Sequence, residues 1–101
     1  MTERKANRMD VQLVLRMLAV PVRRRVVEAL AKQGEMTNAE LTLTVKYPAG
    51  LWQHLQKMLR AGVLYRKEVG PKEICYGLDR EAMAEMAKWF ESMALSAELV
   101  A

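Results

Sequence analysis

The chain has 101 residues, 51% of them hydrophobic, with 16 Lys and Arg against 12 Asp and Glu. That length predicts a single domain over residues 1–101, and the apolar content excludes intrinsic disorder. One cysteine, Cys75, excludes an internal disulfide framework and a cysteine-rich zinc site. No apolar run approaches the roughly 20 residues of a membrane span, and the charged N-terminus is unlike a signal peptide. We therefore expect a cytoplasmic protein with a flexible N-terminus at residues 1–9.

The charge is unevenly distributed. Residues 1–78 hold 14 Lys and Arg against 7 Asp and Glu, whereas residues 79–101 hold two against five. A basic body with an acidic last segment indicates that the body meets a polyanion while the last segment serves another purpose.

The first half of the chain predicts three helices. Asp10 is placed to cap the first, whose apolar residues recur so widely that we expect it to be buried nearly all round. The second begins near Pro21 and ends near Gly34, with four apolar residues inward and four charged residues outward. The inward set is Val22, Val26, Val27 and Leu30, and the outward set is Arg23, Arg24, Arg25 and Glu28.

The third helix has the firmest boundary. Thr37 and Glu40 have the spacing of a capping box, and Met36 and Leu41 that of a hydrophobic staple. The turn 47–50 then leads into a fourth helix, roughly Ala49–Ala61, with Pro48 suited to its first turn. A short helix, a tight turn and a helix with a Gln/Lys/Arg face predict a helix-turn-helix.

Two strands and a helix complete the chain. Residues 63–69 and 74–78 read as strands around a turn at 70–73, which gives a hairpin placed as a wing (63–78). Residues 79–99 read as a last helix, capped by Asp79, with Met and aromatic residues along one side. The predicted fold is mainly α with a small β-hairpin, in the order α-α-α-α-β-β-α: a winged helix-turn-helix. Cys75 is expected in the core of the second strand, without a redox role.

These elements and several motifs resemble the ArsR (arsenic-repressor-like) family over roughly residues 11–95. The segment 19–23, AVPVR, is similar to the family's Ala-x-Pro-x-Arg start, and the segment 37–41 to its third-helix start. His54-Leu55, Met58 and the segment 61–64 (AGVL) match the end of its recognition segment, and Gly70 with the segment 76–78 (YGL) its wing. The resemblance implies a DNA-binding transcriptional regulator that dimerises through its first and last helices.

The chain departs from the family in three places. Trp52 stands where the family commonly has Ser, and the helix-turn-helix is one residue short between Glu40 and His54. Metal-sensing members carry a Cys-x-Cys pair in the third helix or His and carboxylate pairs in the last one. Here the third helix has no thiol and the last helix no His, so we expect no metal and no cofactor.

Amide and guanidinium groups read base edges, and cations bind phosphates. The candidate DNA-binding residues on the fourth helix and the wing are Trp52, Gln53, His54, Gln56, Lys57, Arg60, Lys67 and Lys72. Four of these leave an alternative open. Trp52 either packs on the third helix or touches a thymine methyl or sugar, His54 either contacts the DNA backbone or has a half-buried structural role, and Lys67, like Lys72, either contacts DNA or only adds solubility.

The apolar sides of the first and last helices are expected to pair two copies of the chain. The candidate interface residues are Val11, Val14, Leu15, Leu18, Met83, Met86, Trp89, Phe90 and Met93. The same Met and aromatic residues leave open a small-molecule or redox effector at this seam, and an effector protein at an unknown site also stays open. One His and one Cys, without a Gly-rich phosphate loop, give no catalytic constellation, so an enzyme is not expected.

Together these features predict a homodimeric repressor. It would bind a palindromic operator on double-stranded DNA with the recognition helix 49–61 and the wing 63–78. The alternative is a winged-helix module for protein–protein contact, such as a partner-binding subunit or antirepressor, which Trp52 and the modest net charge favour.

Overall fold

The computed structural model describes residues 10–100, so the N-terminal segment 1–9 expected to be flexible lies outside the described residues. The helices are α2 (Val11–Leu18), α3 (Pro21–Gln33), α4 (Asn38–Val45), α5 (Leu51–Arg60) and α6 (Arg80–Val100). The strands are β1 (Met36–Thr37), β2 (Leu64–Gly70) and β3 (Glu73–Leu78). None of the described helices is both long and apolar enough to cross a membrane.

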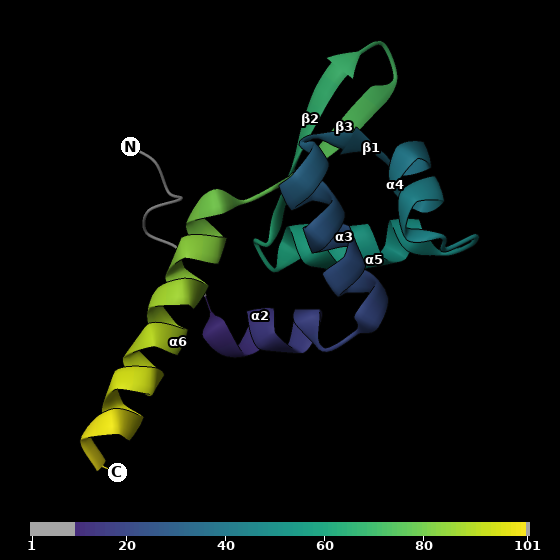
Figure 1. The fold of residues 1–101 in the computed structure, drawn as a ribbon. Helices are drawn as coiled ribbons and strands as arrows, with labels where there is room; N and C mark the ends of the chain where they lie inside the picture. The colour runs from purple at the N-terminus through teal and green to yellow at the C-terminus, as the bar shows by residue number, and fades with distance from the viewer. Residues whose placement is uncertain (1–9, 101) are drawn as a thin grey trace.

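Helices α3, α4 and α5 pack around a common core from which the β2–β3 hairpin extends, and α6 leaves the body as a long rod (Figure 1). The core gathers the apolar sides of these helices with the start of β2 and the end of β3; Val26, Leu41, Leu55 and Met58 are almost completely buried in it. The predicted winged helix-turn-helix is confirmed.

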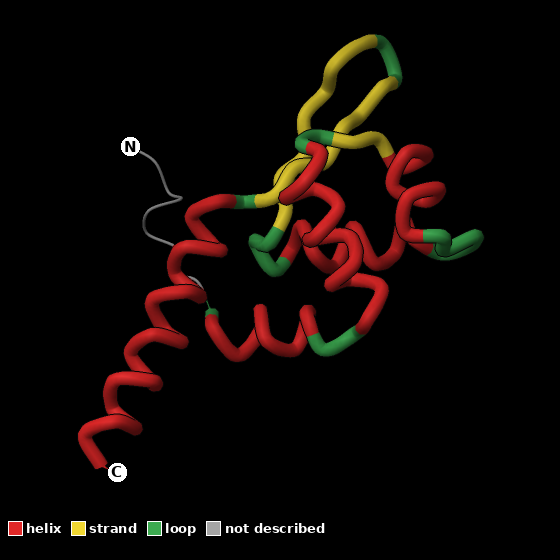
Figure 2. The backbone as a smooth tube through the Cα atoms, viewed as in Figure 1, coloured by secondary structure: helices red, strands yellow, loops and turns green. Residues whose placement is uncertain are grey.

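The sheet has three strands rather than the two predicted (Figure 2). Residues 36–37 pair antiparallel with β3, Met36 opposite Tyr76 and Thr37 opposite Cys75, so that β3 lies between β1 and β2. A two-residue strand shows no alternation of apolar and polar residues, and for this reason it is invisible in the sequence. It fixes the base of the wing to the start of α4.

The predicted caps are confirmed. Asp10 Oδ1 accepts hydrogen bonds from the backbone N–H groups of Gln12 and Leu13 at 3.0 and 3.3 Å. Thr37 and Glu40 form the reciprocal capping box, with N···O distances of 2.9 and 3.1 Å. Asp79 caps α6 by accepting from Ala82 N at 3.0 Å. These contacts satisfy backbone donors that a helix start leaves unpaired.

The start of the recognition helix differs from the prediction. Helix α5 begins at Leu51, so Pro48 lies in the preceding turn and not in the first helical turn. The turn is bounded by two residues with left-handed backbone, Lys46 (φ 55°) after α4 and Gly50 (φ 83°) before α5. A left-handed residue cannot continue a right-handed helix, which separates Pro48 and Ala49 from α5.

Helix α2 is less buried than predicted. Val14 and Met17 face the core, but Leu15 is 37% exposed. Nothing in the described chain covers that side. The exposed Leu15 side chain adds to the apolar surface that α6 also leaves uncovered.

Candidate nucleic-acid interface

Helix α5 divides cleanly into two sides. Leu51, Leu55 and Met58 are buried, and they fix the helix against α3, α4 and the first residues of the wing. The opposite side presents the polar candidates at helical spacing. Trp52, Gln53, Lys57 and Arg60 are exposed and Gln56 is half-buried. An exposed amide followed by two cations on the same side of a helix is a suitable surface for base edges and phosphates.

Trp52 lies in the first turn of α5 and is 57% exposed. Of the two sequence interpretations, packing against the third helix does not agree with this exposure. Its indole borders the polar side, four residues before Gln56 and eight before Arg60, so the three share one line along the helix.

His54 is placed differently from the other candidates. Arg23 Nε donates a hydrogen bond to its Nδ1 at 3.0 Å, and the Tyr47 hydroxyl lies 3.3 Å from its Nε2. Partial burial first, then the positive charges of Arg23 and Lys57, lower the pKa of His54 below its usual value. With both ring nitrogens engaged inside the chain, the geometry favours the half-buried structural interpretation of His54.

The burial of Arg23 differs from the prediction. This side chain was expected on the outward side of α3, but it is 7% exposed, and its Nη1 lies 3.4 Å from both the carbonyl oxygen and the sulfur of Met17. Helix α3 is covered by α2 on one side and α5 on another, so more of its surface is interior than a simple two-sided pattern assumes. Arg24 and Arg25 are exposed, as predicted.

The wing is tied to the body through Glu35. Tyr65 donates a hydrogen bond to Glu35 Oε2 at 2.6 Å, and Lys67 Nζ lies 3.5 Å from Oε1. The hydrogen bond from Tyr65 is the main cause that lowers the pKa of Glu35; burial opposes it, and the nearby charge of Lys67 adds to the lowering. Lys67 therefore shares its charge with a carboxylate, whereas Lys72 stands exposed at the hairpin tip with φ 62°.

The Tyr65 ring also covers Gly77 on the neighbouring strand, where a Cβ atom would collide with it. Cys75, two residues earlier, is half-buried rather than fully in the core, and burial raises the pKa of its thiol. A raised pKa disfavours the thiolate, which is the nucleophilic form of cysteine.

The interface candidates fall into three groups. Val14 and Met86 are buried at 0% and 5% exposure, so they belong to the core of the chain and offer no surface to a second copy. Val11, Leu18 and Met83 are half-buried against that core. The uncovered apolar surface is carried by Leu15 on α2 and by Phe90 and Met93 on α6, with Trp89 stacked edge-on against Phe90.

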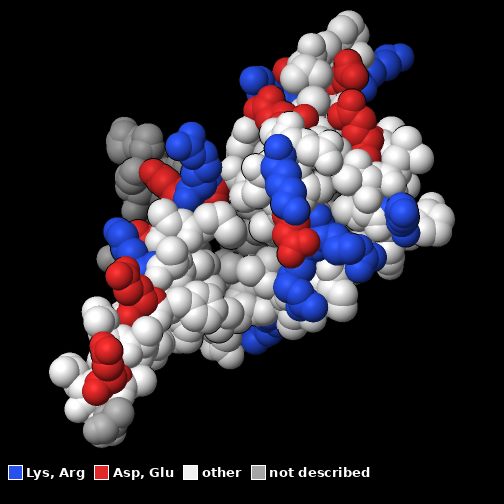
Figure 3. All heavy atoms as spheres, viewed as in Figure 1, with Lys and Arg blue, Asp and Glu red and all other residues white. Residues whose placement is uncertain are grey.

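Beyond Phe90 every described residue of α6 is exposed, including Leu95 (56%), Leu99 (88%) and Val100 (84%). This half of α6 carries acidic side chains on the face seen in Figure 3, where Lys and Arg gather instead over α3. The charge division predicted from the sequence is thus a division between the body and the projecting helix.

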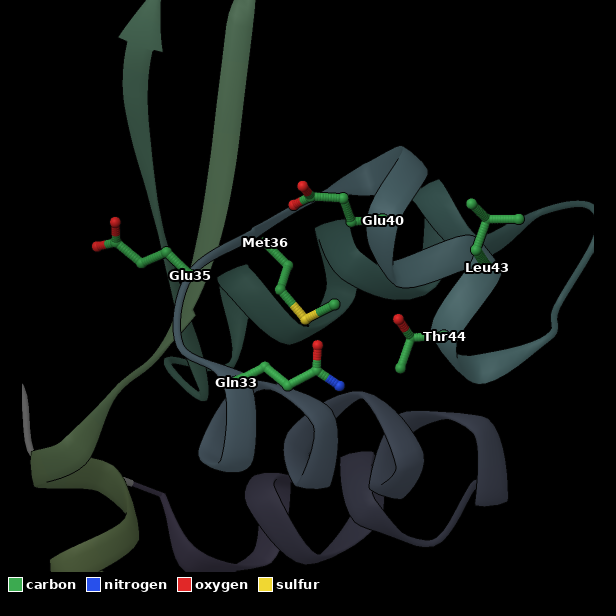
Figure 4. Close-up of a pocket in the computed structure, with 6 residues that line it drawn as sticks. All are labelled: Gln33, Glu35, Met36, Glu40, Leu43 and Thr44. Carbon is green, nitrogen blue, oxygen red and sulfur yellow. The ribbon is translucent and has the colours of Figure 1, made fainter.

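An open hollow of about 340 Å³ lies between the end of α3 and α4 (Figure 4). Gln33 and Thr44 point into the space between the two helices, while Glu35 points away toward the wing. Neither here nor elsewhere in residues 10–100 do His, Cys, Asp and Glu side chains gather in groups of three that could hold a metal ion.

A helix-turn-helix (α4 and α5), followed by a hairpin tied to its base, defines a winged helix-turn-helix protein. A scan of protein-family models returns no match for this chain, and a search of curated proteins returns none either. Solved structures do match.

A crystal structure described as a possible transcriptional regulator for arsenical resistance is 32% identical over 78% of this chain and 81% of that one, with a TM-score of 0.66. The transcriptional repressor BigR from Xylella fastidiosa is 27% identical over 90% and 95% of the two chains, with a TM-score of 0.65. A homodimeric winged helix-turn-helix DNA-binding domain from Mycobacterium bovis, a possible ArsR-family regulator, shares the fold at 22% identity, 97% and 88% coverage and a TM-score of 0.61.

The chain belongs to the ArsR family of winged helix-turn-helix transcriptional regulators. This confirms the resemblance carried by its sequence motifs. The family consists of transcriptional regulators and not of enzymes, in agreement with the lack of a catalytic constellation in the sequence.

Proposed function

We propose that this protein is a homodimeric repressor that binds a palindromic operator in double-stranded DNA. The observation that carries the proposal is the surface of α5: its apolar side is locked into the core, which leaves Gln53, Lys57 and Arg60 exposed together on one rigid helix. Recognition helices of this fold lie in the major groove, where an amide pairs with adenine and a cation with guanine or phosphate. BigR, which is similar to this chain, is a repressor.

Within this proposal the residues have unequal roles. Gln53 and Gln56 read base edges, Lys57 and Arg60 bind guanine or phosphate, and Trp52 contacts a thymine methyl group. Lys72 contacts flanking backbone from the tip of the wing, and Lys67 does so more weakly because Glu35 lies 3.5 Å from its ammonium group. His54 acts inside the chain.

The dimer forms through α2 and α6, with residues 79–99 as the dimerisation helix of a single-domain protomer. Leu15, Phe90 and Met93 supply exposed apolar surface for a symmetric contact. The Mycobacterium bovis domain with this fold is a homodimer. Since α4 carries no thiol, the dimer works without the Cys-based metal switch of metal-sensing relatives. It acts in the cytoplasm, where its operator is found.

The test is binding of the purified protein to the DNA upstream of its own gene, measured by fluorescence anisotropy across a salt series with random duplex as competitor. A dimer with six to ten phosphate contacts should lose about 10³–10⁵ in affinity between 50 and 200 mM salt. Preference for the upstream duplex at one dimer per site supports the proposal, and no binding at low salt refutes it.

One observation favours a different function. Trp52 and Leu43, on the two helices of the helix-turn-helix, are 57% and 78% exposed, and apolar side chains of this size are common where proteins bind proteins. A winged-helix module for a protein partner would bind neither upstream nor random duplex at low salt, so the same titration separates the two functions.

A further inference from the structure

A single side chain, His54, joins the recognition helix to two other segments of the chain. Arg23 on α3 donates from Nε to His54 Nδ1 at 3.0 Å, and the Tyr47 hydroxyl in the 46–50 turn lies 3.3 Å from Nε2. The Tyr47 ring also meets the imidazole edge-on, with ring centroids 5.4 Å apart and planes at 78°. The imidazole is thus held at both nitrogens by groups outside α5.

These contacts define the protonation state of His54. A guanidinium N–H can only donate, so Nδ1 must accept, and the imidazole is neutral with its proton on Nε2, directed at the Tyr47 oxygen. The groups that face it are Arg23 from α3, Tyr47 from the turn and Lys57 from α5 itself. Two of the three are cations, which disfavour a protonated imidazole.

Arg23 is itself firmly placed. It is 7% exposed, and Nη1 lies 3.4 Å from the Met17 carbonyl oxygen at the end of α2. A buried guanidinium is costly unless its donors are satisfied, and its planar shape fixes the directions in which it donates. The α2–α3 junction therefore sets the position of Arg23, and the directional hydrogen bond from Nε in turn orients His54.

We propose that Arg23, acting through neutral His54, is a positioning residue for DNA recognition: within the limits set by the buried side of α5, it adjusts the rotation of the helix about its axis and so directs Gln53 and Lys57 at the bases. The inference rests on the proposed function. Gln53 precedes His54 directly and Lys57 follows it by three residues, so a rotation of the helix at His54 turns both side chains away. Protonation of His54 removes the acceptor at Nδ1 and places a second cation beside Arg23.

The first test is the pH profile of the ratio between operator affinity and random-duplex affinity, from pH 7.5 downward until the NMR signals of the single imidazole show that it is protonated. Because the pKa of His54 is lowered, its neutral form predominates at pH 7.5, and the ratio should fall about tenfold as the pH drops through that lowered pKa. The chain has one histidine, so no other imidazole contributes. His54→Asn keeps an acceptor near the Nδ1 position and does not titrate, so its ratio should stay near the wild-type value at pH 7.5 and remain flat.

The second test compares Arg23→Met with Arg25→Met. Both remove one positive charge from α3, but Arg25 is exposed. Loss of charge weakens binding to operator and random duplex alike, whereas loss of positioning lowers the ratio, about tenfold and for Arg23→Met only. Circular dichroism checks that each variant folds. Should Arg23→Met fail to fold, the His54→Asn profile still decides.

A flat wild-type profile, a His54→Asn profile that falls like the wild type, or equal ratios for the two arginine variants would each overturn the inference while leaving the proposed function intact. Absence of any DNA binding by the wild type at pH 7.5 and low salt would refute the proposed function, and this inference with it.

Discussion

Helix α5 buries its apolar side inside the chain, whereas α6 buries residues only in its first two turns, Ala82 and Met86, and carries most of its remaining apolar residues into solvent. Leu55 is 0% exposed on α5, while Phe90 and Met93 are 54% and 46% exposed on α6. The projecting helix gives a radius of gyration of 15.2 Å, against about 13 Å for a compact domain of this length. The two helices therefore leave opposite surfaces free, a cationic one on α5 and an apolar one on α6.

The two helices therefore need different partners. The polar face of α5 needs no further protein contact, because the apolar side of this helix is already buried, and it stays available to a polyanion. The apolar face of α6 is exposed to water, and burial of its side chains against a partner would be favourable. The α5 half and the α6 half of this comparison can be tested separately.

The largest effect is expected from a charge on the apolar side of α6. Phe90→Glu should convert the proposed dimer into a monomer and lower operator affinity by about 10²–10⁴, since the two half-sites are then no longer bound by one linked molecule. Light scattering after size exclusion and anisotropy measure the two effects.

Lys88→Ala is the matched control, because Lys88 lies on the polar side of the same helix in an exposed pair with Glu85. It should leave both the mass and the affinity unchanged. A Phe90→Glu protein that keeps the mass of a dimer would remove α6 from the interface.

A smaller effect is expected where α5 meets the core. Leu55→Ala should lower the free energy of unfolding by about 2–5 kcal/mol, because it opens a cavity at a fully buried site. Urea denaturation at fixed protein concentration measures this. Leu43→Ala, at a position 78% exposed on α4, should change it by no more than about 0.5 kcal/mol. Similar values for the two would mean that α5 is not anchored as described.

The smallest effect concerns Trp52 and a single methyl group. Replacing thymine by deoxyuridine at the contacted position should lower wild-type affinity about three- to fivefold, since one buried methyl contributes about 0.8 kcal/mol. Trp52→Ser, which removes the indole, should bind both duplexes equally. If both proteins discriminate alike at every thymine of the operator, Trp52 does not touch a methyl group.

The sequence predicted those features that depend on local chemistry. The capping box of Thr37 and Glu40 and the cap at Asp10 need only residues a few positions apart, and both are present. The wing and α6 were likewise found from turn residues and periodicity, with α6 observed at Arg80–Val100 against the predicted 79–99.

The features that sequence reasoning missed depend on distant residues or on backbone conformation. Arg23 was assigned to solvent because its partner His54 lies 31 residues away, although the Arg of the AVPVR segment and the lone His each matched a family motif. The left-handed Gly50 set the start of α5 two residues later than Pro48 suggested. No sequence pattern singles out Glu35, because its partners Tyr65 and Lys67 come near it only when the wing folds back.

The most direct test of the account is a selection of binding sites from random duplexes, with the wild type and Gln53→Ala side by side. The account predicts a two-fold symmetric wild-type motif whose half-sites lie about 10 base pairs apart, as a dimer of this fold requires. Gln53→Ala should lose its preference at one position in each half-site and keep the rest. No enriched motif, or the same motif from both proteins, would contradict the placement of α5 as the helix that reads DNA.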